Sequence, residues 1–451
     1  MITSKNPYNN ETLHSFNELS IKEIEQRVEA AENAFKEWKN VSFTERSALM
    51  RKAAKVLDEN KKDFGKTISR EMGKPIKQSI AEIEKCVWVC EYYAENAQNF
   101  LSQEIIKSDA YKSYVNFEPL GVILAVMPWN FPFWQVFRFA APALMAGNTA
   151  LLKHASNVMM SASNIQKVFE LAGFPENIFQ NLVIKSDKVE NIIKNPFVKA
   201  VTLTGSTPAG SAVASTAAKE IKKSVLELGG SNAFIVLNDA DIEKALEIAM
   251  NARYQNTGQS CIAAKRLLLQ KGIAEEFLKR FIQKVEELKS GDPLDEETYI
   301  GVLAREDLAV DLEEQVNKSV KMGAKIVTGG KRKGAFYEPT VLTDVTKDMP
   351  VFKEETFGPA ICVLVFDTIE EAIEISNTSE FGLGVTVFTK NIDKIEKLAP
   401  EFNEGCVFIN ELVKSDPRLP FGGVKISGFG RELSHYGIIE FVNIKTVYIK
   451  K

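Results

Sequence analysis

Two segments of the sequence combine a chemically reactive side chain with a loop that could expose it. The polar turn from Asn256 to Cys261 contains glycine and ends on a cysteine. The segment Glu227–Gly230 places a carboxylate directly after an apolar, strand-like run. A thiolate is a nucleophile, and a partly desolvated carboxylate can act as a general base. Cys261 and Glu227 are therefore candidates for catalysis, although both residue types also occur in purely structural positions.

Two further segments could bind an anion and hold a hydrogen-bond donor. The segment Thr204–Gly210 follows an apolar run at 200–203 and opens a helical pattern. A strand, a glycine turn and a helix N-terminus form the geometry that binds pyrophosphate through backbone N–H groups. Because the Gly-x-Gly-x-x-Gly fingerprint is missing, a standard Rossmann unit is not indicated. In Pro128–Pro132, two prolines fix the backbone around Asn130, whose side-chain amide suits a held donor.

The histidines and cysteines give no indication of a bound metal. The chain has three histidines and contains neither a His-Glu-x-x-His nor a Cys-x-x-Cys pattern. Cys86 and Cys90 lie four residues apart in a helical pattern and are interpreted as small buried hydrophobic residues. A P-loop and a Gly-x-Ser-x-Gly elbow are also missing from the sequence. No metal is therefore predicted.

The elements that would position these segments change in type along the chain. The first hundred residues have helical patterns, including an apolar stripe that continues to Ile68. Two pairs have capping-box spacing: Ser20 with Glu23 and Ser42 with Glu45. From about residue 108, buried strand patterns alternate with helices, which favours parallel sheets covered on both faces. The alternating pattern at 441–450 predicts a strand that could pair with an edge of another chain.

Length and composition limit the classes of protein to which the chain can belong. At about 150 residues per domain, 451 residues suggest about three folding units. With 56 Lys and Arg against 60 Asp and Glu, the formal charge is −4, which gives no reason to propose nucleic acid or an anionic membrane as a partner. Five cysteines, no signal-peptide pattern and no apolar run of about 18 residues predict a soluble, cytoplasmic protein.

Together these motifs resemble those of the aldehyde dehydrogenase superfamily along essentially the whole chain. Seven segments occur in the family's order: Pro128–Pro132, the strand end at Lys153, Thr204–Gly210, Glu227–Gly230, Asn256–Cys261, Glu355–Pro359 and Pro420–Gly423. The segments 131–138, 153–155 and 431–437 are most similar to those of the short bacterial succinate-semialdehyde dehydrogenases. A chance match of so many independent motifs in one order is not expected.

The resemblance implies an α/β, aldehyde dehydrogenase-like fold with two parallel-sheet βα domains and a small β oligomerisation element. The cofactor-binding domain is expected at 1–103 and 122–228, and the catalytic domain at 229–425. The oligomerisation arm at 104–121 and the C-terminal strand within 426–451 are expected to dock on a neighbouring subunit. Self-association as a dimer or a tetramer follows from this family architecture.

The resemblance also implies a catalytic role for three residues. Cys261 is the expected nucleophile, which would form a thiohemiacetal with an aldehyde. The Asn130 side-chain amide and the Cys261 backbone N–H are expected to hold the oxyanion. Hydride transfer to the nicotinamide would leave a thioester, and Glu227 is expected to activate the water that hydrolyses it.

Eight positions match cofactor-binding positions of the family: Trp129, Lys153, Ser156, Gly205, Ser206, Leu228, Glu355 and Phe357. Lys153 is expected on the adenosine-ribose hydroxyls, Ser206 at the pyrophosphate, and Glu355 and Phe357 at the nicotinamide. Family members that prefer NAD often carry a glutamate at position 156, whose charge repels a 2′-phosphate, and this chain has Ser156 there. The implied cofactor is NADP or NAD, with NADP favoured.

Substrate choice is expected to depend on Arg138, with Ser415 and Trp134 as further substrate-binding candidates. Arg138 matches the position at which the family's succinate-semialdehyde enzymes bind the substrate carboxylate, and a guanidinium suits bidentate contact. The alternative is an arginine paired with a local acid. Mammalian-type members have a second arginine where this chain has Gln255, which leaves room for broader aldehyde acceptance.

The leading hypothesis is the NAD(P)-dependent oxidation of succinic semialdehyde to succinate. The first alternative is a broad-specificity NAD(P)-dependent aldehyde dehydrogenase, and Arg138 is the residue that discriminates between the two. The second alternative is a structural protein on the same scaffold that has lost catalysis. The joint presence of Cys261, Glu227 and Asn130 argues against it.

Overall fold

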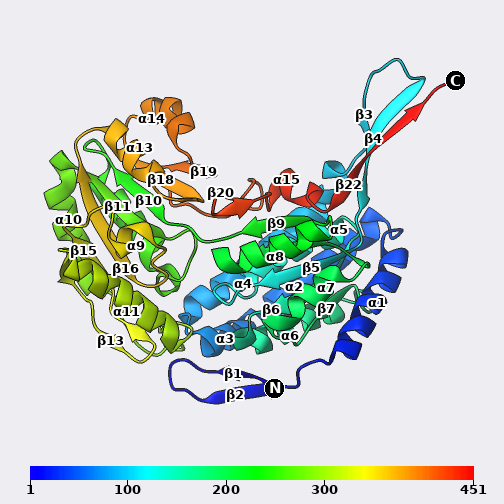
Figure 1. Cartoon of the computed structure of the whole chain (residues 1–451), viewed down its shortest axis with the longest axis horizontal. Coiled ribbons are helices and arrows are strands. Elements are labelled where there is room, and N and C mark those ends of the chain that lie inside the picture. The colour runs from blue at the N-terminus through cyan, green and yellow to red at the C-terminus, as the bar shows by residue number, and fades with distance from the viewer.

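Two mainly parallel β-sheets, each covered by helices, form two lobes, and a β arm projects away from them (Figure 1). The computed structural model describes all of residues 1–451. Buried strands alternate with helices along most of the chain, so the expected α/β class is confirmed.

The first sheet has six strands in the order β21-β9-β8-β5-β6-β7, and every pair is parallel except β21 with β9. The strands are β5 (Val122–Met127), β6 (Thr149–His154), β7 (Phe179–Asn181), β8 (Val198–Thr204), β9 (Lys223–Glu227) and β21 (Gly428–Phe429). The inner strands are buried along almost their whole length, as in parallel sheets with helices on both faces.

Nine helices accompany this sheet: α1 (Ile21–Trp38), α2 (Phe43–Glu59), α3 (Lys61–Met72), α4 (Ile76–Phe100), α5 (Trp134–Met145), α6 (Met159–Leu171), α7 (Val189–Lys194), α8 (Thr207–Lys219) and α15 (Ser434–Ile439). Capping boxes form at both expected helix starts, at Ser20 and at Ser42. The apolar stripe expected to continue to Ile68 is divided between two helices, because Asn60 has non-helical dihedrals (φ −108°, ψ 9°) between α2 and α3.

The first twenty residues form a β-hairpin, so the expectation of helices throughout the first hundred residues is wrong there. β1 (Ile2–Lys5) pairs antiparallel with β2 (Thr12–Phe16). The strands are too short to show a clear periodic pattern in the sequence. A tertiary contact holds the hairpin, since the buried Ser4 hydroxyl donates a hydrogen bond to Glu71 of α3 at 2.6 Å.

The second sheet has seven strands in the order β12-β15-β16-β11-β10-β18-β19, all parallel except β12 with β15. The strands are β10 (Asn232–Val236), β11 (Ala264–Gln270), β12 (Lys325–Thr328), β15 (Thr340–Thr343), β16 (Ala360–Phe366), β18 (Gly384–Phe388) and β19 (Cys406–Ile409). The helices are α9 (Ile242–Tyr254), α10 (Lys271–Glu286), α11 (Glu306–Lys321), α12 (Pro350–Lys353), α13 (Ile369–Asn377) and α14 (Ile392–Leu398). Short elements complete the chain: β13 (Arg332–Lys333), β14 (Phe336–Tyr337), β17 (Phe381–Gly382), β20 (Val424–Lys425) and the 3₁₀ turns at 156–158, 186–188, 255–258 and 399–401.

The projecting arm is a three-stranded antiparallel sheet of β3 (Glu104–Ile105), β4 (Lys112–Pro119) and β22 (Val442–Ile449). It carries the C-terminus away from both lobes in Figure 1. Only β22 of the segment 426–451 belongs to this arm. β21 instead extends the first sheet beside β9, where Gly428 pairs with Glu227.

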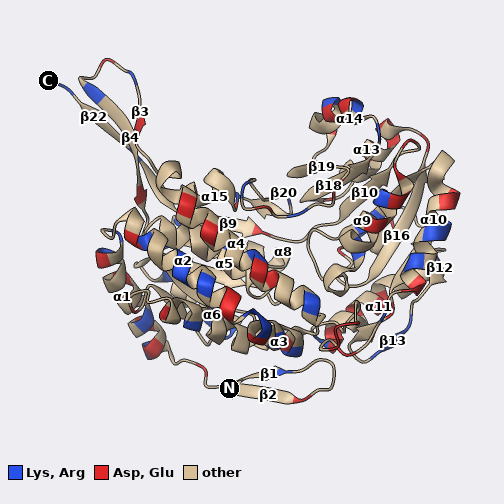
Figure 2. Ribbon diagram, turned by 180° about the vertical axis from the view of Figure 1, so that it is seen from behind, with Lys and Arg blue, Asp and Glu red and all other residues tan.

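Positively and negatively charged residues are mixed along the outer helices in Figure 2. None of the helices combines the length and the apolar composition that a bilayer crossing requires.

The carboxyl ends of neighbouring parallel strands bring three of the sequence motifs together. β5 is followed by Pro128–Pro132, β8 by the turn at Thr204–Ser206, and β9 ends on Glu227. These ends lie at one edge of the first sheet, where open α/β sheets bind ligands. The fourth motif, which ends on Cys261, immediately precedes β11 of the second lobe. The candidate site therefore lies where the two lobes meet.

Candidate active site

One cavity, of about 390 Å³, contains most of the expected cofactor residues. Its lining is Pro128, Trp129, Asn130, Thr204, Gly205, Ser206, Leu228, Gly229, Cys261, Arg305, Leu308, Glu355 and Phe357. Both lobes contribute to it, because the first sheet supplies the strand ends and the second lobe supplies Cys261 and Glu355. We refer to it as the cofactor cavity.

The cofactor cavity fits a phosphate-containing dinucleotide. Ser206 is the N-cap residue of α8, and no side chain caps the first N–H groups of that helix. The positive end of a helix dipole and its free N–H groups attract phosphate. Gly229 lets Glu355 pack closely against the backbone of the cavity wall, since a Cβ at this position would lie 2.4 Å from Glu355 Oε2 and 3.0 Å from the Phe381 ring.

Two of the expected cofactor residues do not line the cofactor cavity. Lys153 is the last residue but one of β6 and is buried, and this burial lowers the pKa of its ammonium group. Ser156 begins the short turn that follows. Conversely, Arg305 and Leu308 line the cavity, and sequence analysis did not identify them. They lie near the start of α11, away from any motif, so no local pattern marked them.

A second cavity, of about 260 Å³, lies on another side of Cys261. Its lining is Gln78, Ala81, Glu82, Lys85, Phe131, Trp134, Gln135, Arg138, Asn251, Gln255, Ser260, Cys261, Ile262, Leu412, Lys414, Ser415 and Phe421. All three residues expected to bind substrate, Arg138, Ser415 and Trp134, line this cavity. Cys261 is the residue that the two cavities share. We refer to the second one as the substrate cavity.

The loop before Cys261 has a strained backbone that the surrounding structure holds in place. Asn256 and Thr257 both have left-handed dihedrals with φ of 55°, which is unusual for a β-branched residue such as threonine. Gly258 continues the left-handed run with φ of 74°. The Thr257 hydroxyl accepts from the Gly301 N–H at 3.0 Å, and Gln259 Oε1 accepts from the Ala304 N–H at 2.9 Å. Strain that is fixed by several contacts is typical of functional sites.

The Asn130 side chain lies beside this loop with part of its hydrogen-bonding capacity unused. Its Nδ2 donates to the Gln259 carbonyl at 3.2 Å, and the Asn256 side chain donates to the Asn130 carbonyl at 2.8 Å. An amide NH₂ group has two N–H donors, so one remains for a ligand in the cofactor cavity. The residue is 4% exposed and therefore held in position.

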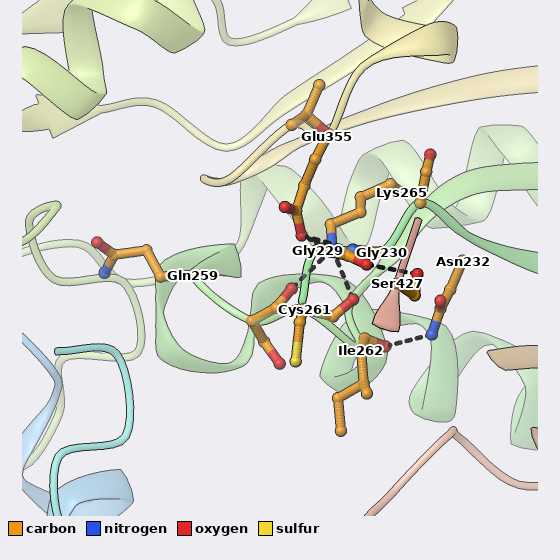
Figure 3. A network of polar contacts seen from close by, with 12 residues as sticks. Gly229, Gly230, Asn232, Gln259, Cys261, Ile262, Lys265, Glu355 and Ser427 are labelled. Carbon is orange, nitrogen blue, oxygen red and sulfur yellow. Dashed lines mark hydrogen bonds and ion pairs between the residues drawn. The ribbon is translucent and has the colours of Figure 1, made fainter. Parts of the chain in front are cut away.

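Burial and one nearby lysine determine the acidity of Cys261. Desolvation raises the pKa of the Cys261 thiol to about 11, and the positive charges of Lys265 and then Arg138 oppose this rise. Figure 3 shows the Lys265 side chain between Glu355 and the loop of Cys261. Its Nζ lies 2.8 Å from both the Ser260 and the Cys261 carbonyl oxygens and 2.9 Å from Glu355 Oε1. Lys265 thus connects the thiol loop to a wall of the cofactor cavity.

Replacing Lys265 by methionine is expected to make Cys261 less reactive. The change removes the cation that most lowers the thiol pKa, and the thiolate is the form that reacts. At about pH 8, alkylation of Cys261 by iodoacetamide should be slower, and its pH–rate profile should move to higher pH. Lys271→Met, at an exposed position of α10, is the matched control. An unchanged profile would contradict the electrostatic role of Lys265.

Glu227 is a buried carboxylate whose two oxygens have no hydrogen-bond partner. It lines neither cavity directly, but its charge influences the titration of Cys261. Desolvation raises the pKa of Glu227 well above its usual value, the Glu432 carboxylate raises it further, and Arg138 opposes the rise. Buried carboxylates without partners are unusual in structural positions and are candidates for proton transfer.

Arg138 pairs with an acid of the protein, as in the alternative that sequence analysis left open, although this acid, Glu432, is distant in the sequence. The Arg138 Nε forms an ion pair with Glu432, its Nη2 donates to the Thr204 hydroxyl at 3.3 Å, and its guanidinium lies 4.9 Å from the centre of the Phe421 ring. The side chain is 2% exposed. Binding of a substrate carboxylate by Arg138 stays a prediction, because one acid already holds this guanidinium.

Replacing Arg138 by methionine is expected to lower the free energy of unfolding by about 3–5 kcal/mol. The reason is that Glu432, 5% exposed, would lose the partner of its buried charge. A urea titration of both proteins measures the difference. The double variant Arg138→Met/Glu432→Leu should recover most of the loss, because no charge is then left unpaired. A single variant as stable as the wild type would show that the ion pair has no structural role.

Comparison with known proteins agrees with this geometry. The model of the Aldehyde dehydrogenase family matches residues 1–447. The chain therefore belongs to the aldehyde dehydrogenase family.

Among its relatives, a protein of Synechocystis sp. named probable succinate-semialdehyde dehydrogenase (NADP+) is 48% identical over 451 residues, covering 99% of each chain. A protein of Escherichia coli K12 named succinate semialdehyde dehydrogenase (NAD(P)+) is 44% identical, covering 99% of this chain and 97% of the other. The crystal structure of succinic semialdehyde dehydrogenase from Streptococcus pyogenes in complex with NADP+ has a TM-score of 0.98 at 35% identity, covering 100% of both chains.

Proposed function

We propose that this protein oxidises succinic semialdehyde to succinate with NADP or NAD. The observation that carries the proposal is the position of Cys261, which is shared by a cavity that fits a dinucleotide and by a separate cavity that contains basic side chains. A nucleophile in that place can contact an aldehyde from one side and a cofactor from the other. The names of the relatives described above support the choice of substrate.

Each step of this reaction can be assigned to particular residues of the chain. Cys261 would attack the aldehyde carbon as a thiolate, and the free N–H of Asn130 and the Cys261 backbone N–H would stabilise the oxyanion. The cofactor would be held by the N-terminus of α8 and by Trp129, Phe357 and Glu355, and it supplies the acceptor for the hydride. Glu227 would remove a proton from the water that cleaves the resulting thioester.

We propose further that the protein prefers NADP to NAD. Ser156→Glu should lower kcat/KM with NADP by about tenfold or more, because a carboxylate repels a 2′-phosphate, and should leave kcat/KM with NAD nearly unchanged. Initial rates with each cofactor, at one concentration of aldehyde, measure this ratio. A wild-type protein with a strong preference for NAD, or a variant without any change, would contradict the role of Ser156.

We also propose self-association and a cytoplasmic location. The exposed apolar residues Ile105, Ile444 and Tyr448 on the projecting arm support a dimer or a tetramer built through β22 and β4. Five free cysteines support a reducing compartment. Sedimentation of the full chain tests the oligomer.

The test of the substrate compares succinic semialdehyde with butanal, its uncharged analogue of equal chain length, at saturating NADP. A charge-assisted contact with the carboxylate should favour the acid by about 2–3 kcal/mol in kcat/KM, which is about 30- to 150-fold. A ratio near one would favour a broad-specificity aldehyde dehydrogenase. Two observations support this second candidate function. Arg138 is already paired with Glu432, and the substrate cavity has Gln255 where a second arginine would be expected.

A further inference from the structure

The substrate cavity is lined by charged side chains, and one of them has no partner of opposite charge. Four charged side chains line it, and three of them already have a partner of opposite sign. Glu82 pairs with Lys74, Arg138 pairs with Glu432, and Lys414 lies 2.8 Å from Glu411. The fourth is Lys85 on α4, which makes no ion pair with any carboxylate of the chain. The cavity therefore carries one positive charge that the protein does not neutralise.

Lys85 is oriented into a small polar cluster at the wall of this cavity. Its Nζ donates to the Ser415 hydroxyl oxygen at 2.9 Å and lies 4.2 Å from the centre of the Trp134 ring. The nearby carboxylates are engaged elsewhere. Glu82 also accepts from the backbone N–H groups of Phe133 and Trp134, and Asp416 accepts from Arg418. At least one N–H of the ammonium group remains for a ligand.

Ser415 can only donate to an incoming ligand. Its Oγ accepts hydrogen bonds from both Lys85 Nζ at 2.9 Å and Trp134 Nε1 at 3.1 Å. A hydroxyl oxygen has two lone pairs and one proton, so both acceptor positions are filled and the proton has no acceptor in the chain. Lys85 and Ser415 together thus offer hydrogen-bond donors and a positive charge, which is the chemistry that recognises an anion.

We propose that Lys85, with the Ser415 hydroxyl, binds the carboxylate at the far end of an aldehyde acid whose aldehyde group reaches Cys261. The proposal rests on the proposed function and deepens it, because it names the residue that selects a carboxylated aldehyde. It assigns to a lysine on α4 the contact that sequence analysis expected from Arg138. Arg138 would then serve mainly to hold Glu432 beside Glu227.

The electrostatic surroundings predict how this contact depends on pH. Burial lowers the pKa of Lys85 to about 8, Arg138 of α5 lowers it as well, and Cys86, Asp416 and Glu82 oppose the decrease. Only the protonated ammonium binds an anion strongly, and a bound carboxylate favours that form. KM for succinic semialdehyde should therefore rise as the pH passes about 8, whereas KM for butanal should not follow this titration.

Lys85→Met is the decisive variant, because it keeps the length of the side chain and removes the charge. kcat/KM for succinic semialdehyde should fall about 30- to 150-fold, and kcat/KM for butanal should stay within about twofold. Lys85→Arg should retain most of the preference for the acid. Lys77→Met is the matched control, since Lys77 is an exposed lysine of the same helix α4 that lines neither cavity. The control should keep the wild-type ratio.

The Lys85→Met variant is expected to fold, so a loss of activity would not result from unfolding. Removal of Lys85 leaves no carboxylate unpaired, so its melting temperature should be equal to or above that of the wild type. A second readout does not depend on turnover. Succinate, the product, should protect Cys261 from iodoacetamide in the wild type and in Lys77→Met, but not in Lys85→Met.

The outcomes separate this proposal from the proposed function. A wild-type protein without any preference for succinic semialdehyde over butanal would overturn the substrate assignment, and the role of Lys85 with it. A wild type that prefers the acid, together with a Lys85→Met variant that keeps this preference and the succinate protection, would overturn the role of Lys85 alone. Equal losses for both aldehydes in Lys85→Met would likewise overturn it, since they would show a structural role.

Discussion

Replacing Cys261 by alanine should reduce the oxidation of succinic semialdehyde by on the order of 10⁴-fold or more, to the background of the assay. Cys261 is the only residue that lines both cavities, so no other side chain in this place can form a covalent bond with an aldehyde carbon. The loss should appear in kcat with either cofactor, because the missing group is needed for the chemical step itself. Initial rates of cofactor reduction, followed by absorbance in the same buffer for both proteins, measure this loss.

The control for this variant is Cys406→Ala. Cys406 is also partly exposed and also has a pKa raised by burial, but it lies in β19 and lines neither cavity. This variant should keep the wild-type rate. Titration with a thiol-reactive probe should show the loss of one reactive group in Cys261→Ala and not in the control. A Cys261→Ala protein with an unchanged rate would remove the covalent mechanism and would revive a non-catalytic or different role for the site.

Local sequence signals marked those candidate residues that lie in loops with unusual backbone requirements. Asn130 lies between two prolines, and Cys261 follows a run in which Asn256, Thr257 and Gly258 adopt left-handed dihedrals. The residue types in such loops determine the backbone geometry locally. Their motifs can therefore be recognised from the sequence before the fold is known. Glu227 was marked similarly, by the two glycines that follow the strand.

The residues that the sequence did not mark lie in ordinary helical surroundings. Lys85 belongs to a stretch rich in Glu, Lys and Gln, and such a pattern is typical of a solvated helix face. Only the packing of α4 against the loop that carries Ser415 places its ammonium in a cavity, and that contact joins positions 330 residues apart. The Arg138–Glu432 ion pair is equally non-local. Pairings across the fold depend on tertiary structure, and a single sequence does not show them.

Replacing Glu227 by glutamine should lower steady-state turnover by about 10²- to 10⁴-fold, the usual contribution of a general base. The glutamine side chain has nearly the same volume, but its amide cannot accept the proton of the attacking water. Attack by Cys261 does not need this carboxylate in the proposed scheme, so acylation should be partly retained and the acylated protein should accumulate. Mass spectrometry of the intact chain after mixing with aldehyde and cofactor should detect it. A turnover rate equal to that of the wild type would exclude Glu227 as the base.

The same substitution has an effect on stability whose sign follows from the pKa shift. The folded-state pKa of Glu227 is raised, first by desolvation and then by Glu432. A raised pKa means that the folded chain binds the proton more tightly than the unfolded chain does. The stabilisation by this proton is complete below the unfolded value of 4.5 and is lost as the pH rises through the folded-state pKa.

Above the folded-state pKa of Glu227, the wild type must hold a buried charge that Glu227→Gln lacks. The variant should therefore be more stable than the wild type at alkaline pH, while its turnover is low. Thermal melts of both proteins, begun below the unfolded value of 4.5 and continued to alkaline pH, would show the difference widening until the pH has passed the folded-state pKa. Glu227 can act as a base only when it is ionised, and its surroundings disfavour the ionised form. The carboxylate that raises the rate should therefore lower the stability of the folded chain.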